Sequence, residues 1–285
     1  MARISVPEAD AILDHPFPVL DKGFVRLVDY MGGDARVVQA ARVSYGEGTK
    51  TVREDAGLIN YLMKNGHTSP FEQVVLTFHM KLPIFVARQV IRHRTARLNE
   101  ISGRYSVLKD EFYVPAPERV QAQSAVNKQG SGAALAPEVA QQVRQTLEAD
   151  QAGLYSHYEE FLAQDVAREL ARVNLPLSLY TEWYWQVDLH NMLHFLRLRL
   201  DWHAQVEVRA YAEAMAAIAR RVAPLCYEAF EEHVLEGRRF SRKELAALRA
   251  MLHGQPVELA ERARAELEGK LWGVAGAPLA PGGQG

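Results

Sequence analysis

The sequence predicts an α+β fold in which helices pack on a sheet. Residues 73–81 alternate apolar and polar side chains, which is typical of a half-buried strand, whereas residues 83–94 repeat apolar side chains at helical spacing. The chain has 285 residues, of which 48% are hydrophobic and 24% are charged. That is enough apolar material to bury a core in one large domain or two small ones.

The charge balance limits the classes of partner. Lysine and arginine together number 33 and the acidic residues 35, so the formal net charge is -2. A chain with this balance has no overall field that would attract nucleic acid or an acidic membrane. Any basic site must therefore be local, and we expect neither class of partner.

Cysteine content and hydropathy predict a location. The single cysteine, Cys226, excludes an internal disulfide and favours a reducing compartment. Residues 1–20 lack the continuous apolar stretch of a signal peptide, and no segment approaches the roughly eighteen apolar residues of a membrane span. We therefore expect a cytoplasmic protein.

The first elements of the chain include a strand and two helices. Residues 23–34 indicate a short strand that ends in a Gly-Gly turn, after which Asp34 is placed to cap a helix over residues 35–44. Residues 53–67 indicate a second helix, closed by an Asn-Gly pair, the residue types that tolerate the left-handed conformation at a helix end.

The strand over residues 73–81 has one apolar face. Val74, Leu76, Phe78 and Met80 point one way, and Gln73, Thr77, His79 and Lys81 point the other. Pro83 suits the first turn of the helix predicted over residues 83–94. At about 100° per residue this helix is amphipathic, and its polar arc of roughly 140° holds Arg88, Gln89, Arg92 and His93.

A charged segment, RHRTARLNEISGRYS at residues 92–106, begins at the end of that helix. Arginines at a helix C-terminus interact favourably with the helix dipole, which explains Arg92 and Arg94 structurally. It does not explain the polar loop that follows, which precedes a strand-like stretch at residues 105–115 and contains Glu100, Ser102, Gly103 and Arg104. A hydroxyl, a glycine and a bidentate guanidinium suit a phosphate monoester. The residues alone leave two interpretations open, an anion site and a charged surface loop.

The same segment carries a family signature. Arg92, His93 and Arg94, followed after seven residues by Ser102, match the RHR-x7-S signature of the flavin-dependent thymidylate synthases. Further segments resemble the same family in the same order, namely AARVSYGEG, LMKNGHTSPFEQVVLTFHMKLPIFVARQ, EFYVPAPER, ARVNLPLSLYTEWYW and LRLRLDWHAQVEVRAYA. The resemblance covers roughly residues 20–235.

The resemblance implies the reductive methylation of dUMP to dTMP. The methylene group would come from 5,10-methylenetetrahydrofolate and the hydride from FADH2, with NADPH reducing the flavin again. It also implies helices packed on an antiparallel sheet and a homotetramer whose sites are shared between subunits. Cys226 has no neighbouring histidine or arginine in residues 224–230, which form a predicted helix, so it fits a structural role and not that of a thiolate nucleophile.

The resemblance also assigns a dUMP site. Its residues are Gln89, Arg92, Glu100, Ile101, Ser102, Gly103, Arg104, Arg172 and Arg199. Among them Ser102, Gly103 and Arg104 should cradle the phosphate. Arg199 is the expected catalytic residue: an arginine is no general base near neutral pH, but it can hold positive charge against the uracil ring and make C5 nucleophilic.

The flavin has no dedicated nucleotide-binding fingerprint in this sequence. Residues 45–50 and 128–135 are glycine-rich, but neither completes G-x-G-x-x-G or G-x-x-x-x-G-K-[ST], so both are predicted to be loops. The resemblance instead assigns FAD binding to Ser69, Arg92, His93, Arg94, Glu100, Asp188, Leu189, His190 and His194. The family varies at the last four of these positions.

The residues alone leave two other interpretations of function open, a metal hydrolase and an RNA-binding module. His190 and His194 lie four apart on a predicted helix over residues 189–200, a spacing used for zinc in metal hydrolases. Asn191 stands where H-E-x-x-H requires glutamate, and only His203 could be a third ligand, so we expect no metal. His203 and Gln205 are expected to be supporting or structural. An RNA-binding module could use the basic segment beside Tyr105, but the net charge opposes it.

The domain organisation follows from these patterns. Residues 1–240 are predicted to form the synthase domain, and residues 241–285 a helical C-terminal extension, with two short charged helices over residues 240–272 and a disordered tail. Within the first part, residues 120–138 resemble an insertion or surface loop that leads to a polar amphipathic helix.

Overall fold

The computed structural model describes residues 4–43, 52–124 and 130–272. The chain divides into two compact units, Met1–Phe230 and Glu231–Gly285. None of the helices in the described residues is long and apolar enough to cross a membrane. The glycine-rich residues 45–50, part of the segment 128–135 and the tail after residue 272 lie outside the described residues.

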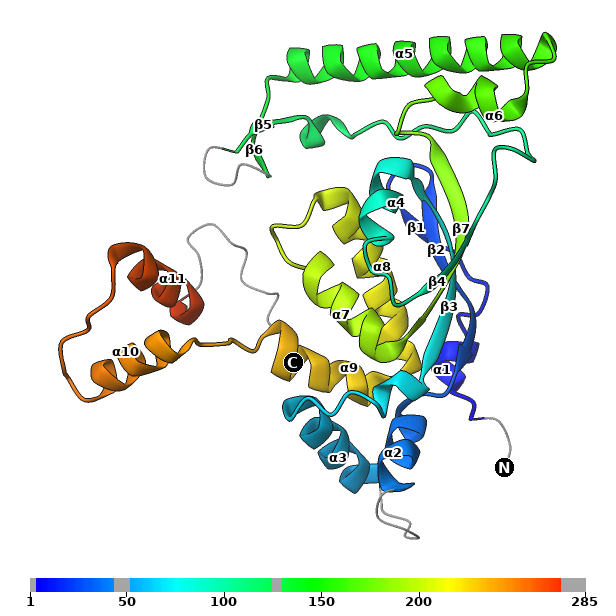
Figure 1. Ribbon diagram of the computed structural model, residues 1–285. Helices are drawn as coiled ribbons and strands as arrows, with labels where there is room; N and C mark the ends of the chain where they lie inside the picture. The colour runs from blue at the N-terminus through cyan, green and yellow to red at the C-terminus, as the bar shows by residue number, and fades with distance from the viewer. Residues whose placement is uncertain (1–3, 44–51, 125–129, 273–285) are drawn as a thin grey trace. The chain divides into compact units, whose positions relative to one another are not determined.

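The first unit is built on a five-stranded antiparallel sheet (Figure 1). Its strands, in spatial order, are β1 (Phe17–Val19), β2 (Gly23–Met31), β3 (Val75–Pro83), β7 (Tyr180–Asp188) and β4 (Arg97–Glu100). The predicted strands over residues 23–34 and 73–81 are confirmed as β2 and β3, and Gly32 supplies the positive φ of 84° in the turn after β2. The expected α+β fold with an antiparallel sheet is confirmed.

One face of the sheet forms the core. Leu76, Phe78 and Met80 are fully buried along β3, as the alternation predicts. On β7, Trp185 lies opposite Phe78 and Trp183 lies opposite Met80, and both tryptophans are at most 2% exposed. Large cross-strand side chains on a shared face are a main source of sheet stability.

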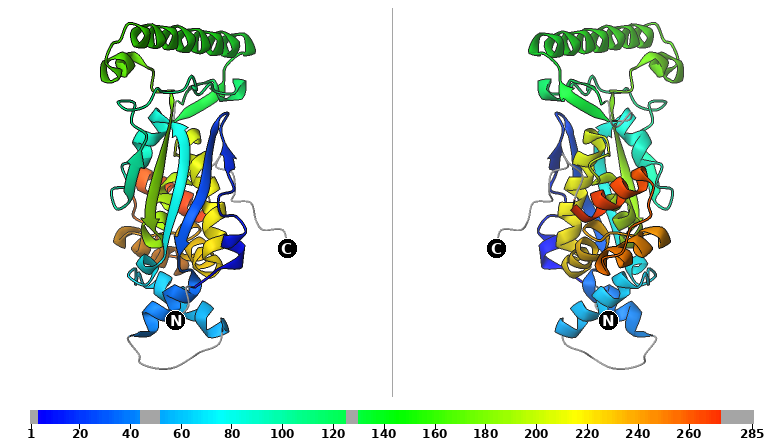
Figure 2. Two further views of the ribbon diagram at one scale, coloured as in Figure 1. Left: turned by 90° about the vertical axis from the view of Figure 1, so that its right-hand side faces the viewer. Right: turned by 90° about the vertical axis from the view of Figure 1, so that its left-hand side faces the viewer.

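Three helices cover this apolar face (Figures 1 and 2). They are α4 (Ile84–Val90), α7 (Leu189–Arg199) and α8 (Val206–Val222). The buried side chains of α7 include Phe195, whose ring lies 5.6 Å from that of Trp185. The helix predicted over residues 189–200 is thereby confirmed, and its packing fixes the position of Arg199 at its last turn.

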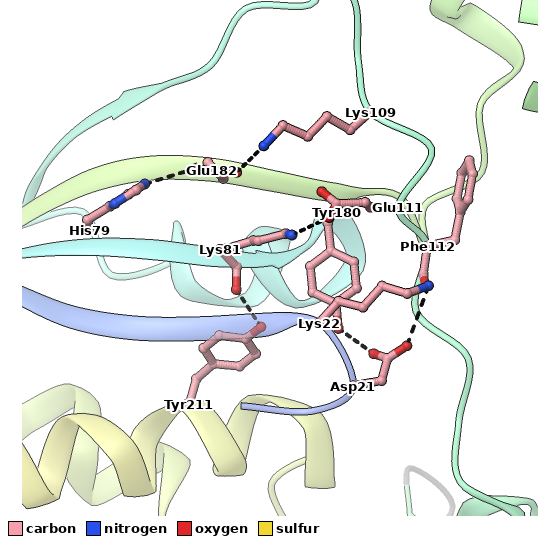
Figure 3. A network of polar contacts seen from close by, with 10 residues as sticks. All are labelled: Asp21, Lys22, His79, Lys81, Lys109, Glu111, Phe112, Tyr180, Glu182 and Tyr211. Carbon is pink, nitrogen blue, oxygen red and sulfur yellow. Dashed lines mark hydrogen bonds and ion pairs between the residues drawn. The ribbon is translucent and has the colours of Figure 1, made fainter. Parts of the chain in front are cut away.

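The opposite face of the sheet is polar and carries a network of contacts (Figure 3). Lys109 donates to Glu182 at 3.3 Å, and Lys81 donates to Glu111 at 2.7 Å. These contacts hold the segment after the charged loop against the strands. The prediction of a strand over residues 105–115 is wrong: this segment is held through side chains and makes only an isolated bridge between Phe112 and Leu179.

Further helices and a 3-10 turn close one end of the first unit. They are α1 (Pro7–Asp10), α2 (Asp34–Arg42), α3 (Val52–Lys64), the 3-10 turn η2 (Phe71–Gln73) and α9 (Pro224–Phe230). The predicted helices over 53–67 and 224–230 are confirmed, and Gly66, with φ of 69°, follows the end of α3.

The expected role of Asp34 as the cap of its own helix is wrong. Gly33 occupies the N-cap position of α2, and Asp34 is the first helical residue. Its carboxylate instead accepts hydrogen bonds from the backbone N–H groups of Leu225 at 2.9 Å and Cys226 at 3.0 Å. Asp34 therefore caps the first turn of α9, a helix 190 positions further along the chain and invisible to local sequence patterns.

The predicted insertion at residues 120–138 contains a small hairpin. Strands β5 (Gln121–Gln123) and β6 (Ser131–Ala134) pair, after the 3-10 turn η3 (Pro117–Arg119), and the predicted helix follows as α5 (Pro137–Ala163). Two short helical turns then lead back to the sheet, α6 (Arg168–Ala171) and η4 (Arg172–Asn174). Arg119 ties the hairpin to α8, since it donates to Ser131 at 2.7 Å and to Glu207 at 2.8 Å.

The second unit contains the two charged helices that the sequence predicts. After a π-helical turn, η5 (Glu231–Leu235), come α10 (Arg242–Leu252) and α11 (Glu261–Trp272). Ser241 and Glu244 form a capping box at the start of α10, and Lys270 of α11 contacts Glu244 at 2.5 Å. The hydrogen bonds from Lys270 and Ser241 lower the pKa of Glu244 to about 2.

Candidate active site

The RHR motif lies in the turn between α4 and β4. The prediction that the helix over residues 83–94 carries Arg92 and His93 on its polar arc is wrong, because α4 ends at Val90. The chain has to reverse there so that β4 can pair with β7, and the N–H of His93 closes the turn on the carbonyl of Val90 at 3.0 Å. As a result His93 is half-buried, whereas Arg92 and Arg94 are exposed.

His93 meets Arg199, the expected catalytic residue. Arg199 Nε donates to His93 Nε2 at 3.3 Å, and Arg199 Nη2 donates to the backbone carbonyl of Gln89 at 3.3 Å. The side-chain amide of Gln89 in turn donates to Gln205 at 2.6 Å. The structure therefore brings together three of the residues expected from the sequence, with Gln205 as a supporting partner. We call Gln89, His93, Arg199 and Gln205 the Arg199 cluster.

The electrostatics of this cluster keep its histidine neutral. Burial, the positive charge of Arg199 and the neighbouring His194 lower the pKa of His93 to about 4. Partial desolvation, followed by the charges of Arg197 and His190, likewise lowers the pKa of His194. The Arg199 cluster thus has one fixed cation among neutral groups near neutral pH, so its net field favours an anionic or electron-rich ligand.

Glu100 lies at the end of β4, at the edge of the sheet. The sequence predicts this segment as loop, and the structure corrects it to strand, because Arg97–Glu100 pair with β7. Glu100 lies opposite Trp183 and therefore on the helix-covered face. Its carboxylate accepts from the hydroxyl of Thr181 at 2.6 Å, which leaves the second carboxylate oxygen without a partner within the described residues.

The loop after β4 is folded around a glycine. The backbone N–H of Arg104 donates to Ser102 Oγ at 3.3 Å. Gly103 is buried, and a Cβ there would lie 3.0 Å from Arg172 Cδ and 3.0 Å from Leu108 Cδ1. The absence of a Cβ lets the Arg172 side chain pack closely against this loop, although Arg172 lies some seventy positions along the chain. We call Ser102, Gly103, Arg104 and Arg172 the 102–104 loop cluster.

Three of the arginines expected at the site lack acidic partners in the described part of the chain. Arg104 forms an exposed ion pair with Glu169 at 3.3 Å, a contact that contributes little in water. In contrast, no ion pair or hydrogen bond from the guanidinium of Arg92, Arg94 or Arg172 is present within residues 4–43, 52–124 and 130–272. Guanidinium groups without carboxylate partners suit phosphate or diphosphate oxygens.

Four of the remaining expected FAD residues, Asp188, Leu189, His190 and His194, lie at or near the start of α7, and Ser69 lies before η2. Asp188 is the N-cap of α7 and accepts from the backbone N–H of Asn191 at 2.9 Å and from its side chain at 2.7 Å. The Leu189 side chain is buried, His190 is half-buried and His194 is exposed. Ser69 is exposed before η2 and makes no side-chain hydrogen bond in the described part of the chain.

The residues that could bind a metal do not converge. Among the described residues, no group of three His, Cys, Asp or Glu side chains is arranged to hold an ion. His203, the third ligand considered for His190 and His194, instead donates its backbone N–H to Asp201 at 2.9 Å, and its ring contacts the same carboxylate at 2.8 Å.

Comparison with known proteins agrees with this geometry. Residues 26–225 match the family described as thymidylate synthase complementing protein, and residues 239–272 match the thymidylate synthase ThyX C-terminal domain. The chain belongs to this family. The resemblance drawn from the RHR motif is therefore confirmed, and the second unit contains a recognised part of the family.

Two relatives and one solved structure illustrate the match. The chain is 57% identical over 272 residues to the flavin-dependent thymidylate synthase of Treponema pallidum (strain Nichols), covering 95% of this chain and 89% of the relative. It is 62% identical over 244 residues to that of Treponema denticola, covering 85% and 92%. The UMP/dUMP methylase PolB from Streptomyces cacaoi, solved with 5-Br dUMP, superimposes with a TM-score of 0.71 and 32% identity over 77% of this chain and 99% of that one.

The environment of Cys226 bears on whether its thiol could be a nucleophile. Cys226 is 0% exposed, and burial together with the neighbouring Asp34 raises the pKa of its thiol well above the ordinary value. A thiol in this setting is neither accessible nor ionised, so it cannot attack uracil. The structural role expected for Cys226 in this family member agrees with its environment.

Sequence reasoning missed Thr181 and gave Gln205 only a general supporting role. Thr181 is 5% exposed and its hydroxyl orients Glu100. A signal was present, because Thr181 shares the buried face of β7 with Trp183 and Trp185 and is a polar residue on an apolar stripe. Nothing local marks Gln205, whose amide partner lies on α4.

Proposed function

We propose that this enzyme methylates dUMP reductively to dTMP, with 5,10-methylenetetrahydrofolate as the methylene donor and FAD as the redox cofactor, reduced again by NADPH. The observation that carries the proposal is the arrangement of the family signature. Its Ser102 lies in a loop that packs against Arg172, whose guanidinium has no ion pair or hydrogen bond within the described residues, and its His93 accepts a hydrogen bond from the half-buried Arg199.

The 102–104 loop cluster would bind the nucleotide phosphate. Ser102 offers a hydroxyl, Gly103 close access to the backbone, and Arg104 and Arg172 two guanidinium groups. Gln89, Arg92, Glu100 and Ile101 complete the proposed dUMP pocket. Support for the nucleotide comes from PolB, which has the same fold and is described as bound with 5-Br dUMP.

Arg199 would act on the pyrimidine. Two of its N–H groups are used by His93 and Gln89, and the other three are free within the described residues. A guanidinium placed against N3 and an exocyclic oxygen of uracil stabilises negative charge there and raises the nucleophilicity of C5. No thiolate is needed, in agreement with the buried Cys226.

The residues of the RHR motif fit FAD. Arg92 and Arg94 are exposed guanidinium groups with no carboxylate partner in the described part of the chain, as binding of a diphosphate requires. We place FAD against Arg92, His93 and Arg94, with Ser69, Glu100, Asp188, Leu189, His190 and His194 as further contacts. When bound, the cofactor supplies the hydride that converts the transferred methylene to a methyl group.

The site would be shared between the subunits of a homotetramer. Exposed large apolar side chains are close in sequence to the residues of the 102–104 loop cluster, namely Leu98, Ile101, Tyr105, Val107, Leu170, Val173 and Leu177. A second group, Ile91, Leu198, Trp202 and Val206, is close in sequence to the residues of the Arg199 cluster. Apolar surface of this extent is typical of an interface, and no hydrogen bond or ion pair joins the two clusters within the described residues of one chain. Docking one surface of each kind would complete a site.

The proposed partners are small molecules and other copies of the chain. We propose a cytoplasmic enzyme, because a single cysteine matches a reducing compartment. No nucleic acid or membrane partner is part of the proposal.

The test separates phosphate recognition from flavin binding. The purified protein should be yellow or become yellow with added FAD, and calorimetry should detect dUMP binding to the FAD-loaded enzyme.

Arg104→Ala and Ser102→Ala should weaken dUMP binding by about 10-fold or more while leaving uridine binding unchanged, because only dUMP has a phosphate group that these residues could contact. Glu169→Ala, which removes only the ion-pair partner of Arg104, is the matched control and should leave dUMP binding within about 2-fold. A colourless protein that FAD cannot reconstitute, or equal losses for dUMP and uridine, would contradict the proposal.

A further inference from the structure

We infer that His93 is a positioning residue for Arg199: its Nε2 lone pair holds the guanidinium in the orientation that presents the free N–H groups to the substrate. The inference rests on the proposed function and adds to it. In this role His93 orients Arg199 in addition to contacting the flavin.

Two acceptors fix the guanidinium plane of Arg199. The His93 ring nitrogen receives Nε–H at 3.3 Å, and the Gln89 carbonyl receives one N–H of Nη2 at 3.3 Å. Two hydrogen bonds to one edge of a planar group define both its position and its tilt. Nη1 makes no hydrogen bond within the described residues, so its N–H groups are available to a ligand.

His93 is itself held by α7, the helix that carries Arg199. Its ring packs edge-on against Phe195 with 4.9 Å between centroids, and the His194 ring lies 6.0 Å away. Phe195 and Arg199 are four residues apart and therefore share one face of α7. Because Phe195 is fully buried, the imidazole has a rigid support.

The hydrogen bond defines the tautomer of His93. Nε2 can accept from Arg199 only when it carries no proton, so the ring must be neutral with its proton on Nδ1. The charged or titratable groups that act on this ring are Arg199 and His194, both on α7, and with burial they hold the pKa of His93 at about 4. The acceptor is consequently present throughout the neutral range.

Paired variants test the role of the acceptor. His93→Phe keeps the flat ring against Phe195 but removes the acceptor, whereas His93→Gln returns a side-chain oxygen at similar reach. We expect kcat for dTMP formation to fall by about 10- to 100-fold in the Phe variant and to recover most of this loss in the Gln variant. His157→Phe, at an exposed position on α5, is the control for loss of a histidine elsewhere and should behave as the wild type.

A second comparison separates this role from flavin binding. Both variants are loaded with FAD to equal occupancy, which is measured by absorbance. The rate of flavin reduction by NADPH is then measured separately from the rate of flavin reoxidation in the presence of dUMP and methylenetetrahydrofolate. The inference expects slow reoxidation with a normal rate of reduction. It also expects His93→Phe to add less than about 2-fold to the loss already caused by Arg199→Lys, because the contact is already broken. Wild-type kcat in His93→Phe, or a full additional loss in the Arg199→Lys background, would overturn it.

A spectroscopic measurement covers the case in which a variant does not bind FAD. Nitrogen NMR of histidine-labelled wild-type protein, assigned with His93→Phe, should show His93 as the neutral Nδ1–H tautomer at pH 7. An Nε2–H tautomer or an imidazolium would overturn the inference. If the wild-type enzyme makes no dTMP, the proposed function fails, and this measurement still decides whether His93 accepts from Arg199.

Discussion

The guanidinium of Arg199 is the functional group on which the proposed chemistry depends. It is half-buried at the last turn of α7 and donates hydrogen bonds to the neutral imidazole of His93 and to the backbone carbonyl of Gln89. Arg199→Ala should lower kcat at saturating dUMP by about 10²- to 10³-fold, the cost of a lost transition-state donor, while FAD remains bound. Arg197→Ala, on the same helix two residues earlier, is the matched control and should retain turnover. Steady-state assay of both variants measures this, and near-normal turnover of Arg199→Ala would remove Arg199 from the catalytic role.

The thiol of Cys226 should have no part in the reaction. It is fully buried behind Asp34, and the pKa of the thiol is raised. Cys226→Ala should therefore keep kcat within about 2-fold, since a buried un-ionised thiol is inert, and a thiol reagent should label the wild type only after unfolding. Loss of turnover in a folded, FAD-loaded Cys226→Ala variant would indicate thiolate catalysis instead.

Between secondary-structure elements, the Asp34 carboxylate joins α2 to the start of α9. Asp34 accepts two backbone N–H groups at the start of α9, so Asp34→Ala should lower the free energy of unfolding by about 1 kcal/mol without changing activity per folded enzyme. Glu228→Ala, an exposed position of the same helix, should change it by less than about 0.5 kcal/mol. Denaturant titration of the two variants compares them. Equal stabilities would show that the Asp34 contact contributes nothing.

Elements with a strong local pattern could be predicted, and elements defined by distant partners could not. β3 and α7 follow directly from their apolar periodicity. β4 has four exposed residues and is a strand only because β7 offers it an edge, while residues 105–115 look strand-like but are held by side chains such as Lys109. Tertiary pairing overrides local propensity in both cases.

The same distinction applies to the candidate site. The signature residues could be found because they are adjacent in sequence, and Arg172 and Arg199 because the family resemblance names them. The hydrogen bonds of His93 to Arg199 and of Thr181 to Glu100 join residues about eighty or more positions apart. They depend on how α7 and β7 pack, which no local pattern specifies.

At the scale of the whole molecule, we expect the enzyme to be active only as an oligomer whose subunits share each site. If the 102–104 loop of one chain meets Arg199 of another, Arg104→Ala and Arg199→Ala subunits, unfolded and reassembled together in equal amounts, should restore activity. Random mixing gives a half times a half, so about a quarter of the sites would be free of both lesions. Turnover near a quarter of the wild type is the expected result. No recovery, with mixed tetramers confirmed by native mass spectrometry, would place both residues in the same chain.

The central claim is that dTMP is made with a hydride from the flavin and without a thiolate. Conversion of a methylene group to a methyl group needs two electrons, which either the flavin or the folate can supply. The most direct measurement is an anaerobic single turnover of enzyme loaded with reduced FAD, given dUMP and methylenetetrahydrofolate without NADPH. We expect one dTMP for each flavin oxidised and tetrahydrofolate as the folate product. Formation of dihydrofolate with the flavin still reduced, or no dTMP at all, would contradict it.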